Sequence, residues 1–141
     1  MPFVYRTRCL LGKGVGVLMP LLMADLAASD RVLAQAASLE GSWRGGGSVA
    51  FADGQRERAE CRAHYHRASG TSYNVTATCA TPSGRATQTA TVRQVGSNSY
   101  QGRFHNSEHN LSGTIFVTVG GNRQSVRLTS DSVSASFELR R

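Results

Sequence analysis

Two alternating segments, each carrying one cysteine, constrain the fold of this chain more than any other feature. They cover residues 56–66 and 72–80 and are joined by a short link around Gly70. Apolar and polar residues alternate in both segments, as they do in strands with one buried face. An antiparallel hairpin centred on Gly70 places Cys61 opposite Cys79, where a disulfide can form. The pattern therefore predicts a β-hairpin with a disulfide between its strands.

The same period of two continues along the chain from residue 38 onward. Turn residues such as Asp53-Gly54 and Gly120-Gly121-Asn122 separate the alternating segments at regular spacing. The predicted strands are residues 41–51, 55–66, 72–80, 85–95, 99–105, 111–119, 123–130 and 133–139. Short, turn-rich links join strands that are antiparallel neighbours. We therefore expect an all-β domain over residues 37–141, an eight-stranded antiparallel up-and-down β-barrel.

Two other all-β arrangements share this alternation. A Greek-key sandwich requires a long crossover, and none is found between the predicted strands. An outer-membrane barrel is expected to have longer late strands and a terminal aromatic residue, whereas this sequence ends in Glu138-Leu139-Arg140-Arg141. The soluble barrel is favoured. Its interior is either filled by side chains or holds one small ligand, and both alternatives stay open.

The first part of the chain has the composition of an export signal. Positive residues precede an apolar run over 14–23, and Ala34-Gln35-Ala36 has the small-x-small pattern of a signal peptidase site. A second acceptable cleavage point lies near Ala28, and a soluble amphipathic helix is the alternative interpretation. We expect a cleavable signal peptide over residues 1–36, a periplasmic or secreted location, and no membrane span after cleavage.

Cleavage after Ala36 leaves 105 residues with 12 arginines, no lysine and 7 acidic residues, a net charge of +5. Guanidinium groups bind phosphates and carboxylates through two hydrogen bonds. However, only Arg140 and Arg141 are adjacent, and the sequence shows no basic cluster. The favoured interpretation is a solvated surface. Only Cys61 and Cys79 remain, so one intramolecular disulfide is expected in an oxidising compartment.

The first predicted strand begins with Gly41-Ser42-Trp43. This resembles the Gly-x-Trp opening of the calycin group, the lipocalin- and avidin-type small β-barrels. The resemblance implies that Trp43 closes one end of the barrel and that Arg140 or Arg141 packs across its ring. It implies no ligand, because the ligand residues of avidin-type barrels do not map onto these strands. The helix that precedes the last strand of lipocalins is also missing from the pattern.

The candidate ligand-binding residues are aromatic side chains expected at the barrel interior or rim, together with a terminal arginine. They are Trp43, Tyr65, Tyr73, Tyr100, Phe104 and Arg140. The sequence contains no Gly-x-Ser-x-Gly motif and indicates no carboxylate pair, so it gives no sign of nucleophilic catalysis or glycoside hydrolysis. We therefore expect neither an enzyme nor a cofactor. Gly45-Gly46-Gly47 opens no helix and is interpreted as a strand bend rather than a phosphate loop.

Histidines are the remaining candidates for chemistry. His105, Glu108 and His109 form the best local set for a metal ion. His64 and His66 share another strand face and are expected at the opposite rim of the barrel. Without a further ligand and supporting hydrogen bonds, we expect surface histidines rather than a metal site.

These observations favour an exported, non-enzymatic barrel that binds a small hydrophobic or envelope-derived molecule. The alternative is a protein-interaction module, an inhibitor or an envelope-associated partner, acting through a basic outer face or rim. Nucleic-acid binding is disfavoured because the aromatic residues fall in the interior register and not among exposed arginines.

Overall fold

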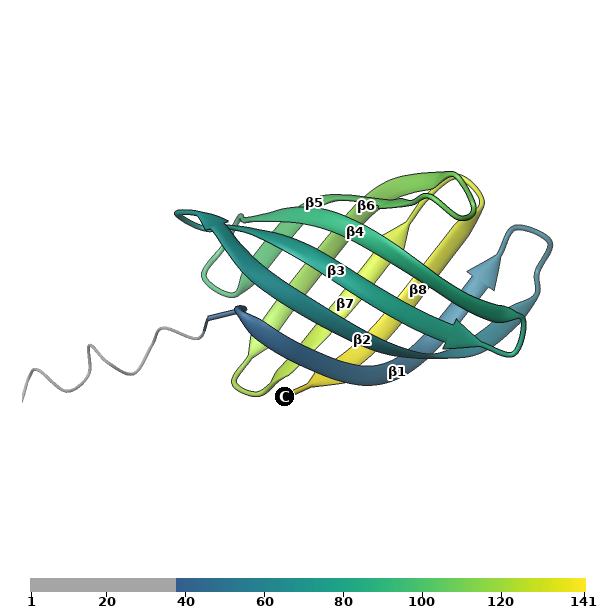
Figure 1. The fold of residues 1–141 in the computed structure, drawn as a ribbon, viewed down its shortest axis with the longest axis horizontal. Coiled ribbons are helices and arrows are strands. Elements are labelled where there is room, and N and C mark those ends of the chain that lie inside the picture. Colours follow the sequence, from purple (N-terminus) through teal and green to yellow (C-terminus); the bar gives the residue numbers. More distant parts are fainter. Residues whose placement is uncertain (1–37) are drawn as a thin grey trace, which may run out of the picture. The chain divides into compact units, whose positions relative to one another are not determined.

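Eight antiparallel strands close into a barrel in the computed structural model, which describes residues 38–141 (Figure 1). The strands are β1 (Gly41–Phe51), β2 (Arg56–Ser69), β3 (Ser72–Thr81), β4 (Gly84–Gln94), β5 (Ser99–Asn106), β6 (Leu111–Gly120), β7 (Arg123–Thr129) and β8 (Val133–Arg140). Each strand pairs with the next, and β8 pairs with β1. The predicted fold class is confirmed. The expected signal peptide lies outside the described residues.

Most predicted strand ends agree with the structure to within one residue. The exception is β2, which runs three residues beyond the predicted end at His66. Its pairing with β3 shifts by one residue between Arg67 and Ser69, as in a β-bulge. Gly70 then turns the chain with a φ of 49°. Because of the bulge and the tight turn, the first residues of the expected link continue β2 as far as Ser69.

The β2–β3 hairpin has the predicted register. Cys61 pairs with Cys79, and Tyr65 pairs with Val75. The two cysteines form a disulfide, with their Cα atoms 4.1 Å apart. The sulfur atoms lie inside the barrel, where both residues are buried. The disulfide therefore joins two neighbouring strands within the core.

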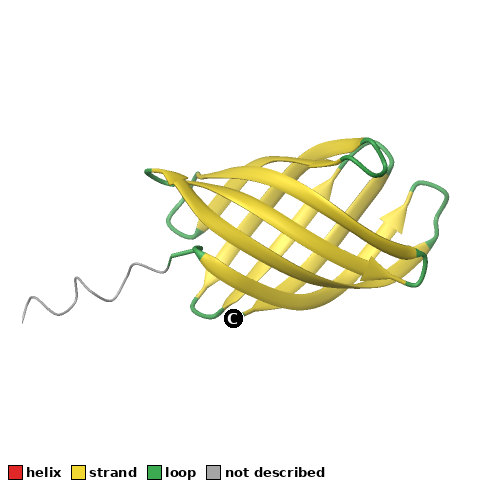
Figure 2. Ribbon diagram, viewed as in Figure 1, coloured by secondary structure: helices red, strands yellow, loops and turns green. Residues whose placement is uncertain are grey.

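Inward and outward positions differ sharply in chemistry. In β2, inward positions such as Ala59 and Ala63 are buried, while Arg58, Arg62 and the polar residues between them are exposed. Strands and loops account for all the described residues (Figure 2). None of residues 38–141 belongs to a helix long and apolar enough to cross a membrane.

Two glycines allow β1 and β8 to approach closely enough to close the barrel. A Cβ atom on Gly45 would lie 2.0 Å from the carbonyl oxygen of Glu138. A Cβ atom on Gly47 would lie 1.9 Å from that of Ser136. Any larger residue would collide with the β8 backbone, so the glycine run predicted as a strand bend is a requirement for closure.

The two ends of the barrel differ. The closed end, on the left in Figure 1, is where β1, β3, β5 and β7 begin. Large side chains buried there include Leu39, Trp43 and Tyr65. At the open end, where those four strands finish, inward residues such as Val49 and Leu111 are only half-buried. The open end is therefore the candidate position of a ligand site.

Candidate functional site

Trp43 seals the closed end of the barrel. Its side chain is 1% exposed, and its indole Nε1–H donates a hydrogen bond to the Leu39 carbonyl oxygen at 2.9 Å. The guanidinium carbon of Arg141 lies 4.4 Å from the centroid of the Trp43 ring. Arg141 also donates hydrogen bonds of 2.8 Å to the carbonyl oxygens of Glu40 and Ser38. Residues 38–40 are thereby held across the end of the barrel.

The part that the resemblance implied for a terminal arginine is therefore taken by Arg141. Arg140, the candidate named for the ligand site, is exposed on the outer face and pairs with Arg44 and Arg123. Alternation along β8 explains the difference, because Leu139 points inward and Arg140 points outward.

A buried polar pair also lies at the closed end. The Tyr65 hydroxyl donates a hydrogen bond of 2.7 Å to the Gln124 side-chain oxygen, and each residue is 1% exposed. Burial raises the pKa of Tyr65 well above its ordinary value, so the phenol stays protonated and continues to donate. Within the described residues, Gln124 Nε2 has no hydrogen-bond partner.

Tyr73 and Tyr100 complete the closed end. Their rings meet edge to face with centroids 5.7 Å apart, and the Arg67 guanidinium lies 5.0 Å from the Tyr73 centroid. Burial raises the pKa of Tyr100, and the neighbouring Tyr73 raises it by a smaller amount. Arg67 lowers this pKa and partly offsets the rise. Four of the six predicted ligand residues thus lie inside the barrel at this end, and Arg140 lies on its outer face. A role for them in ligand binding stays a prediction.

The middle of the barrel is filled. The space between Tyr65, Phe104 and Phe137 measures only ≈ 40 Å³. That volume has room for about one water molecule. A ligand of any size cannot lie there without displacing core side chains.

A cavity of ≈ 550 Å³ opens at the other end. We call it the cup. Its volume lies within the roughly 300–1,000 Å³ typical of small-molecule sites. Its apolar lining includes Val49, Phe51, Phe104, Leu111, Leu128, Val133, Ala135 and Phe137. Of the six predicted ligand residues, only Phe104 lines the cup. The other residues that line the cup were not predicted, because alternation shows which residues point inward but not which end of the barrel is closed by side chains.

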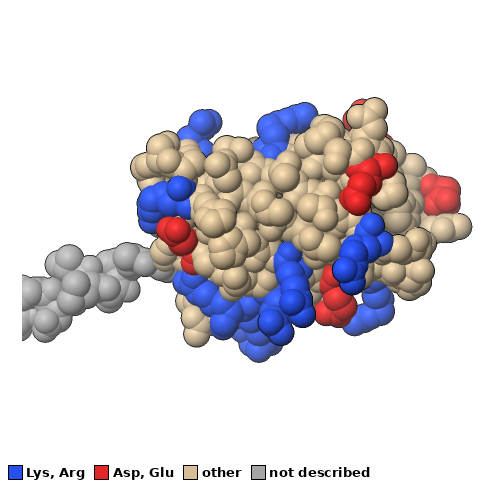
Figure 3. Space-filling view, viewed as in Figure 1, with Lys and Arg blue, Asp and Glu red and all other residues tan. Residues whose placement is uncertain are grey.

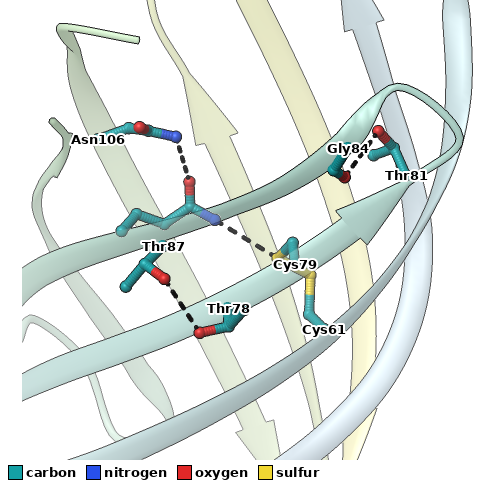
Figure 4. The surroundings of a disulfide bond; sticks show 8 residues. Cys61, Thr78, Cys79, Thr81, Gly84, Thr87 and Asn106 are labelled. Atoms are coloured by element: carbon teal, nitrogen blue, oxygen red, sulfur yellow. Dashed lines mark hydrogen bonds between the residues drawn. A yellow bond between two sulfur atoms is a disulfide. The ribbon is translucent and has the colours of Figure 1, made fainter. Parts of the chain in front are cut away.

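Polar groups in the cup are held in place by hydrogen bonds. Asn106, which is 4% exposed, donates from Nδ2 to Gln88 Oε1 at 3.1 Å and accepts from the His109 backbone N–H at 3.2 Å. Gln88 in turn donates to the Cys79 sulfur at 3.4 Å. Figure 4 shows this chain of contacts running from Asn106 to the disulfide. The cup therefore has a fixed amide pair above an apolar floor.

Glu57 lies at the rim of the cup, at an inward position opposite Val49. Its Oε2 accepts a hydrogen bond from the Ser83 hydroxyl, and its Oε1 is buried without a partner in residues 38–141. Hydrogen bonds from Ser83, and then from Thr81, hold the pKa of Glu57 below its ordinary value. The ionised carboxylate therefore ties the start of β2 to the β3–β4 turn.

The candidate metal ligands have separate partners. His105 Nδ1 is hydrogen-bonded to Ser112 Oγ at 2.8 Å on the outer face, and Glu108 accepts from the Thr87 backbone N–H at 2.7 Å. His109 lines the cup. In the part of the chain that the structure describes, no group of three or more His, Cys, Asp or Glu side chains could hold a metal ion.

The histidines lie toward different ends of the barrel. His64 Nδ1 is hydrogen-bonded to Ser42 Oγ at 2.8 Å, beside the start of β1 at the closed end. His109 follows β5 and lines the cup at the open end. His64 and His109 therefore lie toward opposite ends of the barrel.

Comparisons with known proteins give a fold and no family. No protein-family model matches the chain, and no curated protein matches it. Among solved structures, it is similar to the redesigned β-barrel mFAP1 bound to DFHBI, with a TM-score of 0.62 and 17% identity over 73% of this chain and 94% of that one. It is also similar to a de novo designed fluorescence-activating β-barrel, with a TM-score of 0.57 and 16% identity over 73% and 93% of the two chains. At such low identity, the structural similarity shows only that the barrel architecture is shared.

Proposed function

We propose that this protein is a non-enzymatic β-barrel that binds a small, mainly apolar molecule in the cup. The observation that carries the proposal is the contrast between the two ends of the barrel. Trp43 and Arg141 seal one end, whereas the other holds a cavity of ≈ 550 Å³. Half-buried apolar side chains around that cavity gain further burial when a ligand enters.

The cup also suggests the shape of the ligand. Phe104 and Phe137 form an apolar floor, and the Gln88–Asn106 amide pair lies on one side. A flat ring system with one or two hydrogen-bonding groups would match both features. The similarity to designed barrels is in keeping with this, since mFAP1 and mFAP0 are described with DFHBI bound.

We also propose that the protein acts outside the cytoplasm. The export signal expected over residues 1–36 and the disulfide both support this location. The packing of Arg141 across the Trp43 ring supports a relationship to the calycin group. Intact-mass measurement of the protein from a periplasmic extract tests the location, with a mature chain beginning at Ala37 as the expected result. Full-length protein retained in the cytoplasm would contradict it.

Native mass spectrometry of the exported protein tests the proposed function. We expect a co-purifying small molecule, or a one-to-one complex with the neutral dye N-phenyl-1-naphthylamine. The same dye should fluoresce on binding, because the cup excludes water from it. A bare disulfide-bonded mass together with the absence of dye binding would overturn the proposal.

A further inference from the structure

Four arginines lie side by side on the outer face of the barrel. Arg123 on β7 pairs with Arg140 on β8, and Arg140 also pairs with Arg44 on β1. Arg44 in turn pairs with Arg62 on β2. We call these four residues the arginine row. The sequence shows no basic cluster because the row joins residues from both ends of the domain.

The row is exposed and lacks acidic partners. All four side chains are exposed. Within residues 38–141 the structure records no hydrogen bond or ion pair from these guanidinium groups to a carboxylate. The basic side chains gather along the lower edge of the barrel in Figure 3, over the region of β1 and β8. This gathering differs from the solvated surface without a basic cluster that is expected from the sequence.

The nearest acidic residues lie further along the same strands. Glu138 pairs with Gly46, and so does Glu60. Glu138 accepts a hydrogen bond of 2.6 Å from Ser125. Beside the row is an open hollow of ≈ 1020 Å³ whose charged lining is Arg44, Arg62, Arg85, Arg140, Arg141 and Glu60. The hollow is therefore strongly positive.

Such an arrangement costs stability in the free protein. Like charges directly opposite each other on neighbouring strands repel, and the row contains three such pairs in succession. A bound anion would remove this repulsion and form charge-assisted hydrogen bonds with the guanidinium forks.

The spacing of the row suits an extended ligand. Neighbouring strands lie about 4.8 Å apart, so four strands span roughly 14 Å. A single phosphate or carboxylate engages only one or two of the four arginines. A chain with repeated anionic groups, lying across the strands, can engage all of them.

The surroundings of the row indicate the kind of chain. No Trp, Tyr or Phe side chain points outward from β1, β2, β7 or β8, so nucleic-acid bases have no stacking surface there. Val95 is the one exposed large apolar side chain in residues 38–141, and it lies outside the row, so a membrane finds no apolar anchor there. Two hydroxyl groups border the arginines instead, at Ser42 and Ser125, each two residues along its strand from Arg44 or Arg123. They are hydrogen-bonded to His64 and Glu138, and each hydroxyl oxygen has a further lone pair with which to accept a hydrogen bond. Hydroxyls and guanidinium groups together match sugar hydroxyls and acidic sugars.

We propose that the arginine row binds an acidic polysaccharide laid across β7, β8, β1 and β2. The site is separate from the cup and does not depend on a ligand there. It specifies the basic outer face as a carbohydrate-binding surface rather than a surface for a protein partner.

Binding of the disulfide-bonded protein to oligogalacturonate, measured by calorimetry at low salt, tests the proposal. The double variant R44Q/R140Q removes the centre of the row, and R93Q/R103Q removes the same charge from exposed positions on β4 and β5. We expect R44Q/R140Q to bind at least about tenfold more weakly, while R93Q/R103Q changes affinity by less than about threefold. Without ligand, R44Q/R140Q should melt at a higher temperature than the parent because the repulsion is relieved.

Four outcomes would overturn the proposal: an equal loss in both variants, equal binding of neutral maltotetraose, absence of oligogalacturonate binding, or tighter binding of single-stranded DNA, inorganic polyphosphate or anionic vesicles. N-phenyl-1-naphthylamine binding should be unchanged in R44Q/R140Q, so failure of this proposal is distinguishable from failure of the cup.

Discussion

The guanidinium group of Arg141 lies over the Trp43 ring and also holds two backbone carbonyl groups of the segment that precedes β1. One side chain at the end of β8 thus joins the first and last parts of the barrel. This contact and the cup at the opposite end give the barrel one sealed end and one open end.

Replacing Arg141 by Gln should lower the free energy of unfolding by about 1–2 kcal/mol, because a cation–π contact and two hydrogen bonds are lost together. Urea denaturation measures the change. The control is R140Q, since Arg140 points outward and does not touch Trp43. If the two variants were equally stable, the seal would not depend on Arg141.

Tyr65 and Gln124 should behave as a coupled pair. Y65F leaves the buried Gln124 oxygen without its donor, and we expect a loss of about 1–3 kcal/mol. The double variant Y65F/Q124L should recover much of that loss, because no polar group is then left unpaired. A double-mutant cycle from denaturation curves gives the coupling energy. Simple additivity of the two single changes would contradict the buried pair.

The Cys61–Cys79 disulfide should stabilise the barrel. It links residues 18 apart, so reduction is expected to cost about 2–3 kcal/mol. Melting curves with and without reductant measure the effect. C61A/C79A is the control, because it keeps the core apolar and should be insensitive to reductant. A parent protein that melts at the same temperature under both conditions would show that the disulfide is dispensable.

Filling the cup should weaken ligand binding without unfolding the barrel. Ala86 lines the cup, so A86F places a ring in the space of the ligand. We expect at least about a tenfold loss of N-phenyl-1-naphthylamine affinity, measured by fluorescence titration. A50F makes the same change at an outward position of β1 and should bind normally. Equal binding by both variants would place the dye elsewhere.

Glu57 should make the barrel sensitive to acid. A carboxyl group whose pKa is lower in the folded state than in the unfolded state stabilises the fold above its unfolded pKa, and this contribution disappears as the pH falls. The pKa of Glu57 is lowered by Ser83 and Thr81 from an ordinary 4.5. The difference in urea midpoint between the parent and E57Q should be constant above about pH 4.5 and shrink below it. E60Q, on the outward face of the same strand, is the control. A difference independent of pH would argue against the Ser83 contact.

Contacts between residues close together in the sequence were predictable, whereas contacts between residues far apart in the sequence were not. The disulfide, its register and most strand ends were predictable, because a hairpin with a short link allows one pairing that keeps apolar residues on one face. The choice between Arg140 and Arg141 was not predictable, since it depends on where β8 ends relative to Trp43. The arginine row was missed for the same reason. Arg44 meets Arg140 only because β1 and β8 pair when the barrel closes.

By itself, the sequence determined that residues 38–141 alternate with period two, turn at regular intervals and therefore form antiparallel neighbours with Cys61 facing Cys79. Local sterics and the burial of one face are enough for that. Only the tertiary structure decided which end of the barrel is sealed, which inward residues line the cup, and which arginines share a row. Those features depend on the stagger with which β8 meets β1, and that stagger comes from packing around the whole barrel.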